Sequence, residues 1–318
     1  DITLVTDRMT MSGDARVLAL SAVSPTAGRA GNISISARDT FENDNGIVSS
    51  AALVAAGGDV SIEAGAIYLR NEAFVSARNL ETGTAGSVRM NAGSRIHSDN
   101  STITVTAEQG EGGDIHIAAP EVLLTNQALV SAETSGQGDA GNINITAQNL
   151  FWMDKSTVNT EAKQADGGNI KINTDYMVNL WDSEITASVG GGADTVGGNI
   201  GIDPVYVTLA NSRIIANAFE GRGGNIQIVT DVFISDLDSV VEASSEKGID
   251  GVVEIDALEK VVAQSVKPLP EKFRSAVALL REPCIARLTA GKYSSFVVSG
   301  RDAIPIQPGG LLPSPVSP

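Results

Sequence analysis

Asparagine and aspartate side chains recur at a regular spacing along this chain, each directly after a glycine. Carboxylate and amide oxygens in such a row could bind a hard cation such as calcium. They could equally form a turn in every repeat, because Asn and Asp side chains hydrogen-bond nearby backbone and tolerate tight turns. Uncharged Asn takes most of the places, so we expect a structural ladder of turn residues at Asn32, Asp59, Asp114, Asn142, Asn169, Asn199 and Asn225.

Other metal-binding or nucleophilic residue types are few. His97 and His116 are the only histidines, and zinc needs three or four ligands that converge on one point, so we expect two exposed, unpaired imidazoles. The single cysteine, Cys284, excludes an internal disulfide, and burial is favoured over a role in intermolecular attachment. We expect no cofactor. Weak calcium binding by acidic loops such as Glu81 or Asp194 stays open, although the nonapeptide of calcium-binding β-rolls does not occur.

The elements that would position these residues are repeats. The segment GGNIKI at 168–173 has near-copies, in which the glycine before the polar residue falls at 31, 58, 86, 113, 141, 168, 198, 224 and 251. A fixed period in this range indicates a solenoid or a propeller. The propeller is disfavoured because a WD40 repeat has about 40 residues and a Trp-Asp signature, whereas the whole chain has 2 Trp.

One repeat, residues 58–85, contains three short runs in which apolar and polar residues alternate. The runs are Val60 with Ile62, Ile67 with Leu69, and Phe74 or Val75 with Ala77. Alternation over a few residues is typical of a half-buried strand. Three such strands in about 27 residues predict one coil of a parallel β-helix, in which each strand pairs with its counterpart one coil later.

The columns formed by stacked repeats predict which side chains face the core. Apolar pairs, from Ile33/Ile35 to Val253/Ile255, would form two inward ladders. The residue between each pair is polar or glycine, as expected of a solvated position: Ser34, Ser61, Arg89, His116, Asn144, Lys171, Gly201, Gln227 and Glu254. The glycines would supply either φ > 0 or a close backbone approach at a tight corner.

Composition changes near residue 257. Residues 1–256 hold 14 Lys and Arg against 34 Asp and Glu, whereas 257–318 hold 8 against 4 and include most of the prolines. We predict about nine to ten coils over 1–256, a capping segment over 257–302 and a Pro/Gly-rich tail over 303–318. In the capping segment, LPEKFRSAVALLREP has helical spacing and would cover the last coil through Phe273, Val277 and Leu280.

Charge and length restrict the function. A net charge of −16 makes nucleic acid an unexpected partner, because phosphate binding requires a basic surface. No apolar run approaches the length of a membrane span. Residue 1 already lies inside a repeat and is not Met, so we interpret the chain as a fragment or processed form of a longer protein.

The GGNIxI units, where x is any residue, resemble the secreted haemagglutinin-like exoproteins of bacterial two-partner secretion, the filamentous haemagglutinin class. The resemblance covers the repeats in 1–256 and continues in CIARLTAGKYSSFVVSGRDAIP at 284–305, which is similar to the closing stretch of many members. The chain departs from the family where many members have Gly-Gly-Leu-Pro, since it has Asp302, Ala303, Ile304 and Pro305 there.

The resemblance implies a right-handed parallel β-helix that is secreted or displayed at the bacterial cell surface as an adhesin or fibre. Export would use an outer-membrane pore that recognises an amino-terminal domain missing from this sequence. Glycans, cell-surface proteins and further copies of the chain are the implied partners. A self-assembling extracellular filament or matrix subunit is the alternative, and no catalytic residues are carried over.

A polysaccharide-active β-helix enzyme is a third hypothesis. Glycoside hydrolysis needs two carboxylates that face each other across the substrate, whereas Glu254 is the only acid in the outward column. A lyase would need clustered basic groups or calcium, and Arg89 and Lys171 are three coils apart. We therefore expect no enzymatic activity.

The repeat of 30 residues contains one clear insertion, SVGGGADTV at 188–196. Insertions in repeat proteins form loops on one face, which is often the binding face. The recognition-loop candidates are therefore Gly190, Gly191, Gly192 and Asp194.

Overall fold

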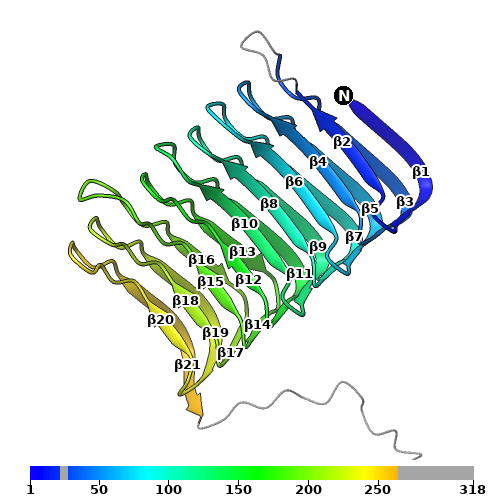
Figure 1. Ribbon diagram of the computed structural model, residues 1–318. Helices are drawn as coiled ribbons and strands as arrows, with labels where there is room; N and C mark the ends of the chain where they lie inside the picture. The colour runs from blue at the N-terminus through cyan, green and yellow to red at the C-terminus, as the bar shows by residue number, and fades with distance from the viewer. Residues whose placement is uncertain (22–27, 264–318) are drawn as a thin grey trace, which may run out of the picture. The chain divides into compact units, whose positions relative to one another are not determined.

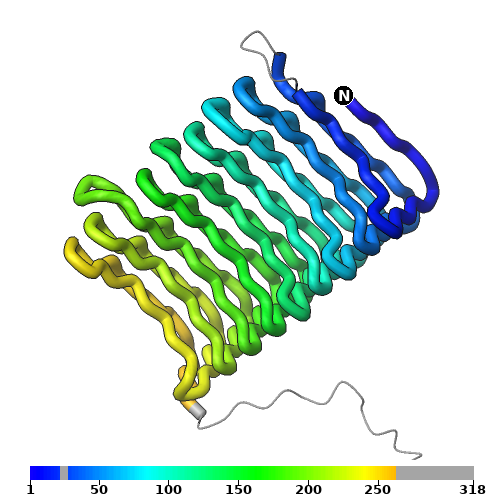
Figure 2. The backbone as a smooth tube through the Cα atoms, in the orientation of Figure 1, coloured from blue at the N-terminus to red at the C-terminus, as the bar shows by residue number. Residues whose placement is uncertain are grey.

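The computed structural model describes residues 1–21 and 28–263, which form a stack of coils (Figure 1). Successive coils lie side by side in chain order along the stack (Figure 2). Every strand pairing is parallel and joins a strand to its equivalent one coil away, for example β3 to β5 and β5 to β7. The architecture is a parallel β-solenoid of about nine coils, which confirms the fold class predicted from the repeats.

Two sheets make up the stack. The 12-stranded sheet contains β1 (Ile2–Ser12), β3 (Ile33–Asp44), β5 (Val60–Arg70), β7 (Val88–Asp99), β9 (Ile115–Thr125), β11 (Ile143–Asp154), β13 (Ile170–Thr174), β14 (Met177–Trp181), β16 (Ile200–Asp203), β17 (Tyr206–Ala210), β19 (Ile226–Asp236) and β21 (Val253–Ala263). The 9-stranded sheet contains β2 (Arg16–Leu20), β4 (Ile47–Ala52), β6 (Phe74–Asn79), β8 (Thr102–Ala107), β10 (Leu129–Thr134), β12 (Thr157–Asn159), β15 (Glu184–Thr186), β18 (Arg213–Ile215) and β20 (Val240–Glu242).

The prediction of three short strands per coil is wrong for most coils. The first two alternating runs join into one long strand with a register shift at its bend, as between Ala64 and Ala66 in β5. Separate strands occur only as β13 with β14 and as β16 with β17, among the described coils. The bend exposes consecutive residues such as Arg38 and Asp39 while the strand continues on either side.

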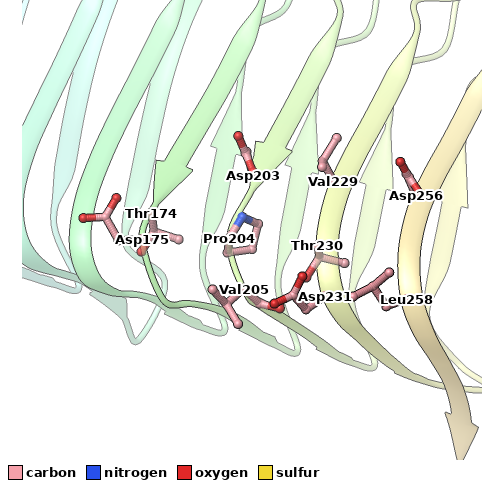
Figure 3. A pocket seen from close by; sticks show the side chains of 10 residues that line it. All are labelled: Thr174, Asp175, Asp203, Pro204, Val205, Val229, Thr230, Asp231, Asp256 and Leu258. Carbon is pink, nitrogen blue, oxygen red and sulfur yellow. The ribbon is translucent and has the colours of Figure 1, made fainter.

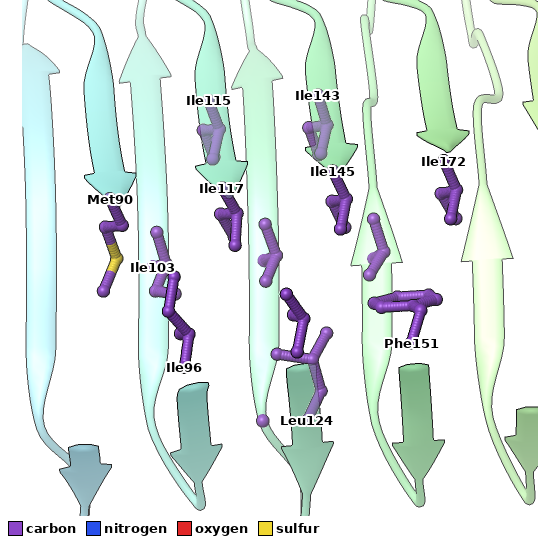
Figure 4. Packing of buried hydrophobic residues seen from close by; sticks show 14 of the residues in the cluster. Met90, Ile96, Ile103, Ile115, Ile117, Leu124, Ile143, Ile145, Phe151 and Ile172 are labelled. Atoms are coloured by element: carbon purple, nitrogen blue, oxygen red, sulfur yellow. The ribbon is translucent and has the colours of Figure 1, made fainter. Parts of the chain in front are cut away.

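The inward ladders fill the interior. From Ile33/Ile35 to Ile226/Ile228 every paired side chain is at most 2% exposed, whereas Val253 in the last described coil is 38% exposed. The outward column is partly or fully exposed, so the predicted facing of this strand is confirmed. Each long strand has a first arm before the bend and a second arm after it. Figure 4 shows the stacked ladders of the first arm beside buried residues from the second arm, among them Ile96, Leu124 and Phe151.

The repeat glycines form a column where coils approach each other closely. A Cβ on Gly141 would lie 1.9 Å from the carbonyl oxygen of Gly113, and one on Gly198 would lie 1.9 Å from that of Gly168. Gly13 is the only glycine in the described ranges with a left-handed φ. Close backbone approach, rather than positive φ, is therefore why this column needs glycine.

Left-handed backbone occurs instead at the corner between the two sheets, and mainly on residues other than glycine. Asn and Asp tolerate this conformation better than other side chains do, and they take most of the positions: Asp14, Asn45, Asn71, Glu72, Asn100, Asn126, Gln127, Lys155, Asp182 and Asn211. This second corner was not identified from the sequence.

Strand β21 continues past residue 256 to Ala263, so the described strands extend beyond the boundary predicted at residue 256. The predicted cap helix with Phe273, Val277 and Leu280, together with Cys284 and the tail, lies outside the described residues. No helix in the described ranges is long and apolar enough to cross a membrane.

Candidate functional surfaces

The seven Asn and Asp residues that follow the repeat glycines form a continuous hydrogen-bonded ladder. In each, a side-chain oxygen accepts the backbone N–H of a residue one coil later. Asn142 Oδ1 accepts from Asn169 at 3.0 Å, and Asn169 Oδ1 accepts from Asn199 at 2.9 Å. Ser87 completes the column, because its hydroxyl accepts the N–H of Asp114 at 3.3 Å. These oxygens are thus engaged with the corner backbone.

A second ladder occupies the left-handed corner. The side-chain amide of Asn71 donates to Asp44 at 2.7 Å, and that of Asn211 donates to Asp182 at 2.7 Å. Equivalent bonds join Asn45 to Asp14 and Asn126 to Asp99. The sequence signal was present as Asn or Asp every 26 to 29 residues at 45, 71, 100, 126, 182 and 211, with Lys155 interrupting it.

The candidate loop lies beside two neighbouring coils. Gly190, Gly192 and Asp194 are exposed, whereas Gly191 is buried. The loop is closed by Thr195, whose hydroxyl donates to the Gly192 carbonyl at 2.8 Å.

Glycines 190–192 share a shallow depression of about 420 Å³ with Lys163, Phe219 and Glu220. Lys247 lies over this patch, with Nζ 4.0 Å from the Phe219 ring and 2.9 Å from Glu220 Oε1. The candidate loop therefore lies beside the Phe219 ring, which already makes a cation–π contact with Lys247.

A groove of about 430 Å³ runs along the bend of the 12-stranded sheet in the last described coils (Figure 3). It lies where β13 is separated from β14 and β16 from β17. Four aspartates line it, with apolar surface from Pro204, Val205, Val229 and Leu258 between them: Asp175, Asp203, Asp231 and Asp256. Asp203 and Asp256 share an outward column, one on each side of Val229.

The groove carboxylates are unopposed. Within the described residues none of the four forms a salt bridge or accepts a hydrogen bond, whereas Glu121 pairs with Arg95 and Glu220 with Lys247. Unpaired charges of one sign in a groove focus the electrostatic field and repel ligands of that sign. The sequence analysis missed Asp203 and Asp256 because it followed the column of Glu254 and not the next outward column. It missed Asp175 and Asp231 because they lie at the bend, between the alternating runs.

The expectation of two exposed, unpaired histidines is wrong for His97, which is neither, and His116 is also only partly exposed. This side chain is half-buried, and its Nε2 lies 3.0 Å from the hydroxyl oxygen of Thr125, which itself donates to Asp99 at 2.8 Å. Burial lowers the pKa of His97 below 6.5; the Asp99 carboxylate raises it, while Arg70 and Arg95 lower it further. The imidazole thus belongs to a polar network on the outer face of the sheet.

His116 lies elsewhere, in a groove of about 290 Å³ with mixed polar and apolar lining on the first arm of the sheet. Glu63, Arg89 and Asn144 line the same groove. Arg89, His116 and Asn144 are successive members of the outward column. Over residues 1–21 and 28–263, no group of three or more His, Cys, Asp or Glu could hold a metal ion.

Comparison with protein-family models, with curated proteins and with solved structures found no match to this chain.

Proposed function

We propose that the chain is part of a secreted bacterial surface exoprotein, in which the stack of coils acts as an elongated rod for adhesion. The observation that carries the proposal is the unbroken repetition of one coil, together with the resemblance of its repeats and closing stretch to the filamentous haemagglutinin class. Each coil adds about 4.8 Å along the stack, so the rod lengthens without its core becoming wider.

The outer surface fits this role. Inward positions are mainly apolar and corner positions are mainly Gly, Asn or Asp, whereas outward positions vary from Arg89 to Gly201 to Glu254. Such a scaffold carries different surface residues without loss of folding. Binding would combine several weak contacts along the rod, and attachment of many rods to one surface would add avidity.

The test uses the full chain, as monomer and coupled at high density to beads. Bacterial and epithelial cells are the targets, and albumin-coated beads are the control. We expect weak, saturable binding of the monomer and at least about a hundredfold stronger binding of the beads, as avidity predicts. Bead binding no stronger than that of albumin to both cell types would overturn the adhesive function.

Sedimentation velocity over a concentration series separates the adhesin from a self-assembling filament. The adhesive rod predicts one species whose sedimentation coefficient does not grow with concentration. Growth into polymers would support the filament instead.

A further inference from the structure

The outer face of the second sheet arm carries a cluster of large apolar side chains in three consecutive coils. In β11, β14 and β17 exposure alternates between buried and partly exposed positions. The partly exposed apolar residues are Leu150, Trp152, Met177, Trp181 and Tyr206. Both Trp of the chain belong to this cluster, which we call the aromatic platform.

The register shows that these residues are neighbours. Leu150 pairs with Met177, and Met177 pairs with Tyr206, in adjacent parallel strands. Trp152 lies opposite Asn179, two residues before Trp181 on the next strand. Such diagonal positions are within reach of aromatic side chains.

Earlier coils use the same outward positions differently. There the face carries mainly ion pairs, such as Glu42 with Arg70 and Arg95 with Glu121, and its partly exposed large apolar residues, Tyr68 and Leu123, are two strands apart. The aromatic platform is therefore confined to the later coils. A local cluster of half-exposed rings on a face that is otherwise mainly polar marks an interaction site.

Polar groups on the platform lack donors. Asp154 Oδ1 and Asn179 Oδ1 are covered by neighbouring side chains and accept no hydrogen bond in the described structure. Asn179 lies between Trp152 and Thr208 in one outward column, and Asp154 lies directly opposite Trp181. An unpaired buried acceptor is costly, so a ligand rich in hydroxyl donors would gain here once the covering side chains turn.

The platform is continuous with the aspartate groove. Asp175 lines the groove and precedes Tyr176, which is 55% exposed. The Tyr176 and Tyr206 rings meet edge to face with their centroids 5.3 Å apart. The unopposed aspartates disfavour an acidic polymer, and a second copy of this chain would bring its own net charge of −16.

We propose that the aromatic platform binds a neutral polysaccharide. Sugar rings have flat apolar faces that stack on Trp152, Trp181 and Tyr206, and their hydroxyls supply the donors that Asp154 and Asn179 lack. A sheet centre offers a flat surface without the free edge at which a polypeptide adds as a strand. This inference rests on the proposed adhesive function and names the ligand class for it.

The experiment is affinity electrophoresis of the full chain through gels that contain laminarin, hydroxyethylcellulose or polygalacturonate. We expect one or both neutral polymers to retard the chain and the acidic polymer not to. Trp181→Ala and Tyr206→Ala should each weaken retardation by about tenfold, equivalent to about 1.4 kcal/mol. Trp181→Phe should restore much of it.

The matched control is Tyr68→Ala, since Tyr68 is an outward aromatic three coils earlier in the column of Trp152. Thermal melts of each variant identify loss of folding, and Trp181→Phe keeps the test valid if Trp181→Ala unfolds. Equal retardation of wild type and both alanine variants, or no retardation by either neutral polymer, would overturn the site.

The two proposals fail separately. If the alanine variants bind cells as wild type does, the rod is adhesive through another surface and the platform is not its ligand site. If neutral polymers bind the platform while no cell binds the beads, the site stands without the adhesive function. Loss of cell binding in the variants without any polysaccharide binding would indicate a protein ligand and refute the glycan.

Discussion

Replacing Gly198 by alanine tests the close approach of coils at the glycine column. The added Cβ would lie 1.9 Å from the Gly168 carbonyl oxygen, whereas ordinary contact begins near 3.4 Å. The two coils would have to separate locally by about 1.5 Å. Both atoms in the clash are held by backbone, so the strain cannot be relieved by a rotamer change.

The expected cost is about 3 kcal/mol, the upper end for overpacking a tightly packed site. At about 2–4 °C per kcal/mol for a chain of this size class, the midpoint should fall by about 6–12 °C. Thermal melts followed by far-ultraviolet circular dichroism measure this shift.

Gly201→Ala is the matched control three residues away. A Cβ there meets no atom within 4 Å, and the residue lies in the outward column. Its substitution should leave the free energy of unfolding unchanged or raise it by up to about 1 kcal/mol, because alanine restricts the unfolded chain. Equal midpoints for the two variants would refute the explanation of the glycine column.

Three further predictions concern facing, the corner ladder and pH. Ile172→Asp places a charge at a fully buried position and should unfold several coils, whereas Lys171→Asp should change stability by less than about 0.5 kcal/mol. Equal melting midpoints for the two variants would show that the assignment of inward and outward positions is wrong. Asn169→Ala removes the acceptor of the Asn199 N–H and should cost about 1 kcal/mol in urea unfolding, while Asn169→Asp should cost less because it keeps the acceptor. The pKa of His97 is lowered by burial, so the stabilising contribution of this side chain is present above pH 6.5 and is lost as pH falls through the folded-state pKa. Wild type should therefore lose stability relative to His97→Gln between about pH 7.5 and about pH 5. If the difference in free energy of unfolding between the two proteins did not change over this range, the pKa shift would be contradicted.

The coil was predictable because one period carries both the apolar pairs and the corner glycines. Apolar Ile170 and Ile172 flank Lys171, which is the alternation typical of a half-buried strand, and eight other repeats have the same pattern. Repetition turns a weak local signal into a strong one, since each coil must stack on a copy of itself.

The bend was not predictable from alternation alone. Ala64 and Ala66 flank Gly65, and a break in alternation there suggests two strands. The structure keeps one strand because the hydrogen-bonded ladder continues across the register shift. Local pattern does not distinguish a bulge from a loop.

The aromatic platform was missed because its residues are scattered in sequence. In the sequence alone, Trp152 and Trp181 indicate only that the repeats lack the Trp-Asp signature of a WD40 propeller. Their significance depends on register, which places Trp152 beside Asn179 and Asp154 beside Trp181 on one face. Such juxtaposition between coils depends on the stagger of the bend and is not fixed by the repeat period.

The distance between labels in one outward column tests the stack most directly. Spin labels would be placed on the double variants Ser34→Cys/Lys171→Cys and Ser34→Cys/Gln227→Cys, each with Cys284→Ser, and the distance between the labels would be measured by double electron–electron resonance. The column runs Ser34, Ser61, Arg89, His116, Asn144, Lys171, Gly201, Gln227. At about 4.8 Å per step the axial separations are about 24 Å and about 34 Å. Two narrow distributions that differ by about two coil steps would support the stacked rod, and distances that do not increase with coil number would contradict it.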